Sequence, residues 1–126
     1  MRKKVITGRH AVIDAFGLPY DLCNDGKVLM QVLKETARES KSEIIGEVYH
    51  EFSPHGASGV LLIAESHLSF HSYPEYGGIH FDLYTCGTEE DFSKGLAYLE
   101  KWIVANGGVA RVSVIERTLE VEVDNV

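Results

Sequence analysis

Two successive stretches near the middle of this chain alternate strictly between apolar and polar residues, and this pattern restricts the fold more than any other feature. Residues 68–75 and 79–86 each place mainly apolar side chains at every second position. A period of two is typical of a β-strand with one buried face. Gly77 and Gly78 separate the stretches, which predicts two neighbouring strands. Their opposite faces carry polar and reactive side chains, namely Ser69, His71, Tyr73 and Glu75 on the first strand and His80, Asp82, Tyr84 and Cys86 on the second.

The patterns on either side of these strands predict one layered domain over residues 1–126. We expect further strands over residues 9–16, 43–52 and 58–64 and from Val109 onward, and helices from Asp25 to Ala37 and from Thr88 to Ile103. No linker or low-complexity segment divides the chain. The order of these elements predicts an α/β protein of the α+β type, a two-layer sandwich with a mainly antiparallel sheet and the helices on one face.

Length and charge exclude several classes of protein. A chain of 126 residues can bury a single core without disulfides or metal. Its net charge of −7 argues against nucleic-acid binding, which needs clustered basic residues. The longest apolar run, residues 60–64, is far shorter than the roughly 20 residues that cross a membrane. The apolar pair at residues 5–6 is too short for a signal peptide. We therefore expect a cytoplasmic protein that binds neither nucleic acid nor a membrane, with Cys23 and Cys86 as free thiols.

Five of the six histidines lie between residues 50 and 80, and this crowding suggests a functional site. On a strand, however, His67 and His71 lie roughly 13 Å apart, so one metal ion cannot join them. His80 and Cys86 are separated even further, and we expect no metal site. Histidines on a half-buried sheet are usually hydrogen-bonded structural groups. We expect this role for His10, His50, His55 and His80, and assign none to His67.

Cys86 offers one catalytic interpretation, because it directly precedes a predicted helix. This position suits the nucleophile of a Cys–His hydrolase, with His71 or His80 as its base. The sequence contains no recognisable glycine-rich oxyanion segment and no third orienting residue for such a site. A hydrolase therefore remains a minor alternative.

The tripeptide formed by Glu65, Ser66 and His67 offers a different chemistry. A serine hydroxyl can attack the carbonyl of the preceding residue, which converts the peptide bond into an ester. β-Elimination then cuts the chain and leaves a pyruvoyl group at the new N-terminus. Such a ketone can form a Schiff base with a substrate amine and serve as an electron sink for decarboxylation. This chemistry needs a hydroxyl, a base and an acid as helpers, for which Ser58, His71 and Cys86 are candidates.

Several motifs in a fixed order resemble the prokaryotic, short form of S-adenosylmethionine decarboxylase, a pyruvoyl enzyme of polyamine synthesis. The similar segments are GRH at 8–10, FSPHGASGV at 52–60, AESHL at 64–68, HSYPEYG at 71–77 and DLYTCG at 82–87. Glu-Ser-His alone would be a weak signal, whereas the set covers most of residues 50–87. Many relatives have Trp where this chain has Tyr73, and this change keeps an aromatic ring.

The resemblance implies specific roles for residues of this chain. Autocatalytic cleavage between Glu65 and Ser66 would give a β chain of residues 1–65 and an α chain of residues 66–126. Ser66 would become the pyruvoyl group that holds S-adenosylmethionine as a Schiff base, the first step toward S-adenosylmethioninamine for spermidine. The helpers implied are His71 as proton acceptor in processing with Ser58 assisting, Cys86 as proton donor in catalysis, Phe52 against the adenine and Glu75 on the ribose hydroxyls.

One difficulty follows from the strand pattern itself. Ser66 and His71 are five residues apart, so they would face opposite sides of a regular strand. We therefore expect a turn or bulge near residues 65–68. We further expect that a tight turn strains the peptide between Glu65 and Ser66 and excludes water from it.

Two alternatives to this function stay open on the sequence. One is a pyruvoyl-dependent arginine decarboxylase built on the same scaffold, although Phe52 and Glu75 favour a nucleoside substrate. The other is a non-enzymatic domain that binds a small molecule.

For the favoured interpretation we expect a homodimer of processed protomers, because the family pattern implies shared active sites and a one-sided sheet leaves a bare face.

Overall fold

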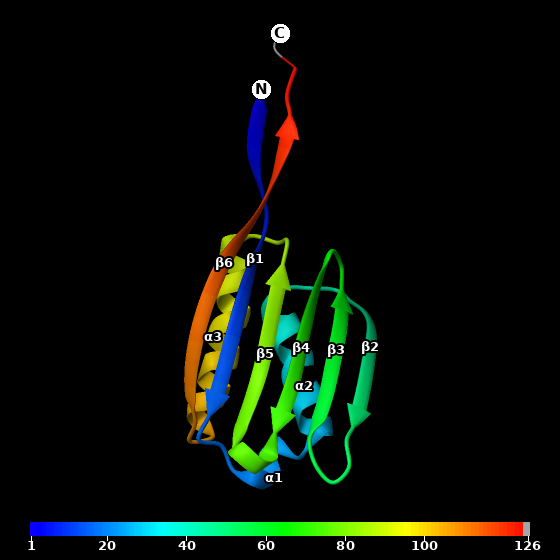
Figure 1. Ribbon diagram of the computed structural model, residues 1–126, viewed down its shortest axis with the longest axis vertical. Helices are drawn as coiled ribbons and strands as arrows, with labels where there is room; N and C mark the ends of the chain where they lie inside the picture. Colours follow the sequence, from blue (N-terminus) through cyan, green and yellow to red (C-terminus); the bar gives the residue numbers. More distant parts are fainter. Residues whose placement is uncertain (125–126) are drawn as a thin grey trace.

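Six strands form one sheet in the computed structural model, which describes residues 1–124 (Figure 1). In chain order the elements are β1 (Arg2–Phe16), α1 (Tyr20–Cys23), α2 (Gly26–Glu39), β2 (Ile44–Glu51), β3 (Ala57–Ile63), β4 (Ser66–Tyr73), the 3-10 turn η1 (Pro74–Tyr76), β5 (Gly78–Thr85), α3 (Glu89–Ala105) and β6 (Val109–Glu122). The strands lie in the order β2-β3-β4-β5-β1-β6, and every neighbouring pair is antiparallel. The predicted α+β fold is confirmed.

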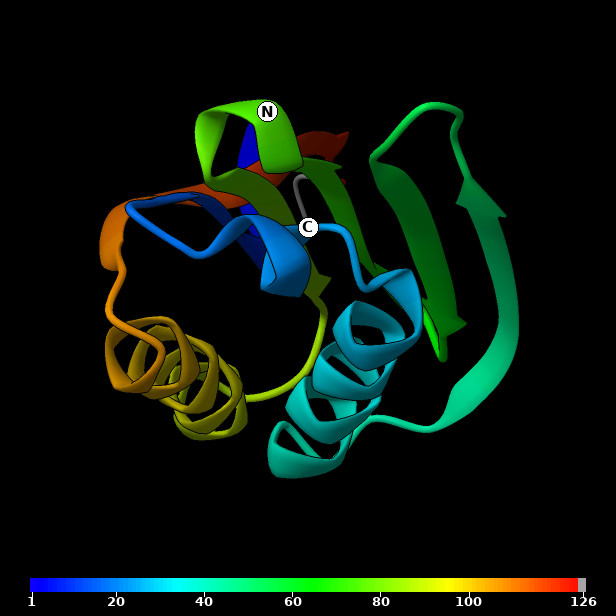
Figure 2. The same cartoon turned by 90° about the horizontal axis from the view of Figure 1, so that it is seen from below.

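Both long helices begin at the predicted caps and cover the same face of the sheet (Figure 2). The Asp25 side chain accepts a hydrogen bond from the backbone N–H of Val28, and the Thr88 side chain accepts one from Asp91. Such bonds satisfy N–H groups that a helix start leaves unpaired. Between α2, α3 and the sheet lies the core, whose fully buried members include Ile13, Leu29, Leu33, Leu61, Leu68, Phe81, Leu83, Leu99 and Ile103.

The first strand is longer than predicted, whereas the last begins at Val109 as expected. The sequence predicted a first strand over residues 9–16, but β1 begins at Arg2 and pairs with β6 as far as Glu122. The two ends form a narrow ribbon that projects from the body of the molecule (Figure 1). Arg2 lies 3.4 Å from both Glu120 and Glu122, so opposite charges from the two ends of the chain meet across this ribbon. Local patterning cannot reveal such a long-range pairing.

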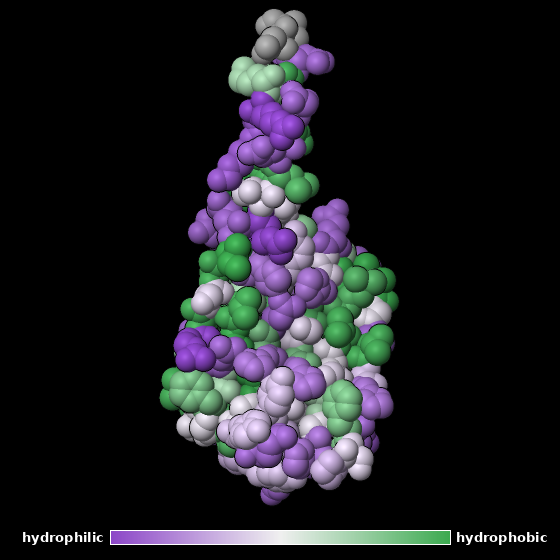
Figure 3. Space-filling model, in the orientation of Figure 1, coloured by the Kyte–Doolittle hydropathy of each residue, from purple (hydrophilic) through white to green (hydrophobic). Residues whose placement is uncertain are grey.

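The face of the sheet opposite the helices, called the outer face here, has no covering layer in the described chain. Polar side chains run along its middle between apolar ones (Figure 3). On the β2–β3 side, Val48, Val60 and Leu62 are 71%, 43% and 54% exposed. On the β1–β6 side, Val12 and Ile115 are 40% and 51% exposed. Apolar groups exposed in this number on one face are typical of an interaction surface.

Within residues 1–124, no helix combines the length and the apolar character that crossing a bilayer requires.

The core makes a direct prediction for stability. Phe81 is 1% exposed and packs edge-on against Trp102, with ring centroids 6.2 Å apart. Phe81→Ala should lower the free energy of unfolding by about 3–5 kcal/mol, because it leaves a cavity in a close-packed core. Urea denaturation measures this loss. Val104→Ala, at a residue 64% exposed on α3, serves as the control and should cost less than about 0.5 kcal/mol. Equal losses for the two variants would contradict this description of the core.

Candidate active site

The Glu65–Ser66 peptide lies in the tight turn between β3 and β4. Ile63 and Ser66 face each other as the last residue pair of the two strands, so the turn contains Ala64 and Glu65 alone. Glu65 has a φ of +62°, which few residues other than glycine adopt. Backbone in this region is strained and persists only where surrounding structure fixes it. The expected tight turn before Ser66 is therefore present, with its strain at Glu65.

Cys86 contacts both residues of this peptide. The Ser66 hydroxyl oxygen accepts a hydrogen bond of 2.9 Å from the backbone N–H of Cys86. The Cys86 thiol donates to the carbonyl oxygen of Glu65 over 3.0 Å, and its sulfur lies 3.7 Å from the Tyr84 hydroxyl. Donation to a carbonyl oxygen stabilises the negative charge that develops when a nucleophile attacks that carbonyl. The site thus presents a hydroxyl, a polarised carbonyl and a thiol at one end of the sheet.

Thr85 adds an unused polar group beside Ser66. Thr85 follows Tyr84, which pairs with His67 in the register of β4 and β5, and it lines the same cavity as Ser66. Its hydroxyl is buried and has no hydrogen-bond partner among the described residues. A buried orphan hydroxyl is costly unless something binds to it. It lies beside a cavity of about 310 Å³ that is also lined by Glu65, Ser66 and Cys86. A small keto group at position 66 fits these surroundings, because the buried Thr85 hydroxyl beside it offers an unused hydrogen-bond donor.

A second group of predicted residues lies toward the opposite end of the sheet. Ser58 and His71 face each other across β3 and β4, and the Ser58 hydroxyl is hydrogen-bonded to Nδ1 of His71. The ring of Phe52 lies 5.7 Å from that of His71. Glu75 belongs to η1 at the same end, where His55 lies 3.0 Å from its carboxylate. The structure therefore brings together the residues predicted to bind the nucleoside and to remove a proton.

Within one chain, these two groups do not meet. Strand β4 pairs without interruption from Ser66 to His71 with β3, so no bulge lies between them. A turn is present at residues 64–65, but the expectation that a turn or bulge near residues 65–68 would bring Ser66 and His71 to one side of the strand is wrong. Ser66 faces the helices and His71 faces outward, about 16 Å apart along the strand. The turn ends before Ser66, so the regular alternation of β4 determines the faces of both residues and places them on opposite sides.

A third cluster on the outer face escaped the sequence analysis. One ligand atom each from His10, His67 and Asp82 lies within 4.8 Å of the others. The Asp82 carboxylate accepts hydrogen bonds from both histidines and from Ser69, the last over 3.1 Å. Arg117 lies 3.2 Å from Nδ1 of His10 and must donate to it, so Nε2 of His10 carries the proton. A metal needs the lone pair of that nitrogen, and this arrangement is therefore a hydrogen-bond network. Alternation across three strands was the signal that could have revealed it.

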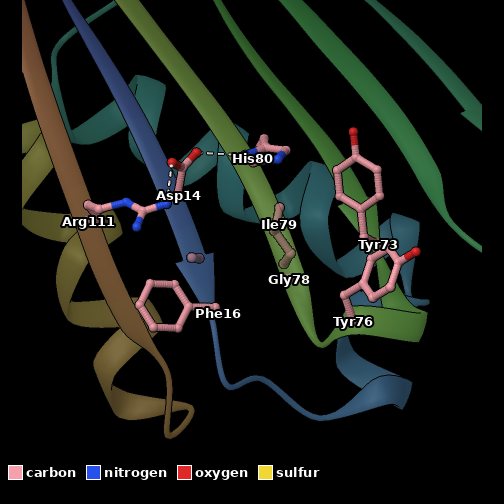
Figure 4. A pocket seen from close by; sticks show the side chains of 9 residues that line it. Asp14, Phe16, Tyr73, Tyr76, Gly78, Ile79, His80 and Arg111 are labelled. Carbon is pink, nitrogen blue, oxygen red and sulfur yellow. Dashed lines mark hydrogen bonds and ion pairs between the residues drawn. The ribbon is translucent and has the colours of Figure 1, made fainter.

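A cavity of about 510 Å³ lies on the outer face between β5 and the end of β1 (Figure 4). Asp14 lies 2.6 Å from His80 and 3.1 Å from Arg111. Hydrogen bonds from His80 and then Arg111 hold the pKa of the Asp14 carboxyl below its usual value. Neither Ser66 nor Cys86 lines this cavity, so it is separate from the Glu65–Ser66 peptide. Tyr73 joins the cavity to His71, with ring centroids 4.6 Å apart.

Comparisons with known proteins agree with the motifs. The family model described as S-adenosylmethionine decarboxylase matches residues 9–118. The S-adenosylmethionine decarboxylase proenzyme of Archaeoglobus fulgidus is 36% identical over 99 residues, which cover 78% of this chain and 88% of that protein. The proenzyme of Thermococcus onnurineus is 38% identical over 113 residues, 90% and 79% of the two chains. The crystal structure of the adenosylmethionine decarboxylase from Aquifex aeolicus superimposes with a TM-score of 0.82 at 29% identity, covering 96% of this chain and 98% of that chain.

The two cysteines should differ in reactivity. Cys23 is fully buried, and burial raises the pKa of its thiol, whereas Cys86 is partly exposed beside the turn. Because the thiolate is the reactive form, iodoacetamide near neutral pH should label Cys86 and spare Cys23. Mass mapping of peptides from the native protein measures this, and unfolded protein, in which both should react, is the control. Labelling of Cys23 as fast as Cys86 would contradict the described burial.

Proposed function

The chain belongs to the S-adenosylmethionine decarboxylase family, whose proenzymes carry a serine-derived pyruvoyl group and act in polyamine synthesis, and we propose how its own residues perform that work. The activity is the decarboxylation of S-adenosylmethionine. The pyruvoyl group supplies an electrophilic ketone that binds the substrate amine covalently and withdraws the electrons left when carbon dioxide departs. The observation that carries the assignment of residues is the contact of Cys86 with both Ser66 and the Glu65 carbonyl.

We propose that Ser66 is the precursor of the pyruvoyl group. Its hydroxyl attacks the carbonyl carbon of Glu65, the C–N bond breaks, and an ester forms between the two residues. Removal of the Ser66 α-proton expels the Glu65 carboxylate, and hydrolysis releases the nitrogen as ammonia. The strained turn at Glu65 and the thiol on its carbonyl oxygen both favour the first step. The products would be fragments of residues 1–65 and 66–126.

Interleaving of strands would hold these fragments together. Residues 1–65 contribute β1, β2 and β3, and residues 66–126 contribute β4, β5 and β6. Because β1 lies between β5 and β6, and β3 pairs with β4, cleavage at the turn removes no strand pairing. Neither fragment alone contains the partners of all its strands, because both neighbours of β1 and the neighbour of β6 belong to the other fragment. The proposed site further requires that residue 66, once cut from Glu65, leave its pairing with Ile63 and turn from the helix side toward the outer face.

We propose that a second copy of the chain completes the site. The two groups of residues lie toward opposite ends of the sheet, so two sheets packed outer face to outer face about a two-fold axis would place the turn of one protomer near the His71 end of the other. Ser66 and Cys86 of one protomer would then act with Phe52, Ser58, His71 and Glu75 of the other. The support for this homodimer is the uncovered face with its apolar borders.

In this arrangement each side chain has a distinct task. His71, oriented by Ser58, takes the α-proton during processing. Phe52 stacks on the adenine and Glu75 accepts hydrogen bonds from the ribose hydroxyls. Cys86 returns a proton to the substrate carbon after decarboxylation, a role supported by its thiol, which already donates a hydrogen bond beside position 66. The two unpaired cysteines also support a cytoplasmic location, where thiols stay reduced.

Cleavage and substrate choice test this function together. The purified protein should appear as two fragments and release carbon dioxide from carboxyl-labelled S-adenosylmethionine, but not from labelled arginine. Ser66→Ala removes the nucleophile, so that chain should stay intact at 14.0 kDa and release none. Intact mass and trapped radioactivity are the measurements.

Ser69→Ala is a matched control, because it removes a serine hydroxyl from the same strand at a residue outside the turn. It should be cleaved like the unaltered chain. Two fragments from the Ser66→Ala chain would contradict the role of Ser66. Faster release from arginine than from S-adenosylmethionine would contradict the roles of Phe52 and Glu75.

A further inference from the structure

We propose that His55 and Tyr20 are positioning residues that hold the Glu75 carboxylate in the orientation needed to bind the ribose hydroxyls. This inference rests on the proposed role of Glu75 and adds two residues to it. His55 was expected to be a structural histidine, and Tyr20 lies in the short helix α1, which the sequence did not predict. Both contacts on which the proposal depends join segments that are distant in the chain.

A relay of two hydrogen bonds leads from Tyr20 to Glu75. Nε2 of His55 lies 3.0 Å from the carboxylate oxygen Oε2 of Glu75, and Nδ1 of His55 lies 3.3 Å from the Tyr20 hydroxyl. An ionised carboxylate only accepts, so Nε2 must donate. In the neutral imidazole Nδ1 then accepts, and the Tyr20 hydroxyl donates to it. The direction of both bonds is therefore fixed by Glu75.

The segment around α1 fastens both loops that carry this relay. The side chain of Asn24 accepts a hydrogen bond of 2.9 Å from the N–H of Gly56, next to His55. The N–H of Leu18 donates over 3.0 Å to the carbonyl of Gly77, just after η1. With Tyr20 bound to His55, residues 18–24 hold the loop between β2 and β3 at a fixed place relative to Glu75. The same loop begins with Phe52, so residues 18–24 fix the positions of both Phe52 and Glu75, the two residues proposed to bind the nucleoside.

The relay leaves the binding side of Glu75 available. His55 occupies oxygen Oε2, and within residues 1–124 no other side-chain or backbone donor bonds to this carboxylate. A carboxylate has about four acceptor positions, so two neighbouring hydroxyls can still bind. The side chains of His55 and Glu75 are 27% and 38% exposed, which leaves them accessible to a ligand. Fixing the carboxylate beforehand lowers the entropy that binding costs.

Steady-state kinetics on the processed enzyme test the proposal. His55→Ala should raise KM for S-adenosylmethionine roughly tenfold, the effect expected for losing one hydrogen bond to a charged group, while kcat changes less than about twofold. His55→Gln keeps an N–H donor and should stay within about threefold of the original KM. Tyr20→Phe removes only the outer hydrogen bond and should raise KM by about two- to threefold. Intact mass should show cleavage unchanged in each variant.

A double-mutant cycle separates positioning from a merely structural role. If His55 acts through Glu75, adding His55→Ala to Glu75→Ala should raise KM no further than Glu75→Ala alone, because Ala leaves no acceptor for His55 to orient. Tyr76→Phe is the control for Tyr20→Phe, because Tyr76 adjoins Glu75 and is 80% exposed; its KM should not change. Multiplying effects in the double variant, or an unchanged KM for His55→Ala beside a raised KM for Glu75→Ala, would overturn the proposal. An unchanged KM for Glu75→Ala would instead contradict the proposed function itself.

Discussion

The uninterrupted pairing of β4 with β3 and β5 is the constraint on which the rest of the structure depends. Side chains of a strand alternate between its faces, so regular pairing from residue 66 onward fixes which residues meet. Ser66 faces the helices beside Thr85, while His71 faces outward beside Ser58. The same pairing holds the turn that strains Glu65 and aligns Cys86 with it. The pairing that places Ser66 beside Cys86 thus also places Ser58 and His71 on the other face of the sheet, away from Ser66.

The separation of Ser66 and Cys86 from Ser58 and His71 suggests a function for the uncovered face of the sheet. In the proposed homodimer, the exposed face, with apolar side chains such as Val48 and Leu62, would be the place where a second copy supplies the residues that the first lacks. Residues 18–24 would serve the same arrangement, because they fix the loops that would face the partner's turn. The proposed cleavage would leave the sheet intact, since the strands of both fragments interleave.

Local sequence patterns predicted much of the fold but only part of the candidate site. Alternation predicted β4 and β5, and the caps Asp25 and Thr88 predicted where the long helices begin. The ribbon of β1 and β6 was missed because it depends on strand pairing between the two ends of the chain. Motifs identified Ser66 and Cys86 as candidates, and the structure brings them together. The network around Asp82 joins four strands and the one around Glu75 joins three segments, and no single stretch of sequence encodes such contacts.

The claim that two protomers share each site is tested most directly by mixing two inactive variants. Cys86→Ala damages the group at the turn, and Glu75→Ala damages the group at the other end. Co-expression of both chains makes roughly half of the dimers mixed, and each mixed dimer then has one undamaged site, so about one quarter of the original activity should return. The assay measures carbon dioxide released from S-adenosylmethionine at a concentration well below KM. Activity no greater than the sum of the two variants expressed separately would show that each chain works alone.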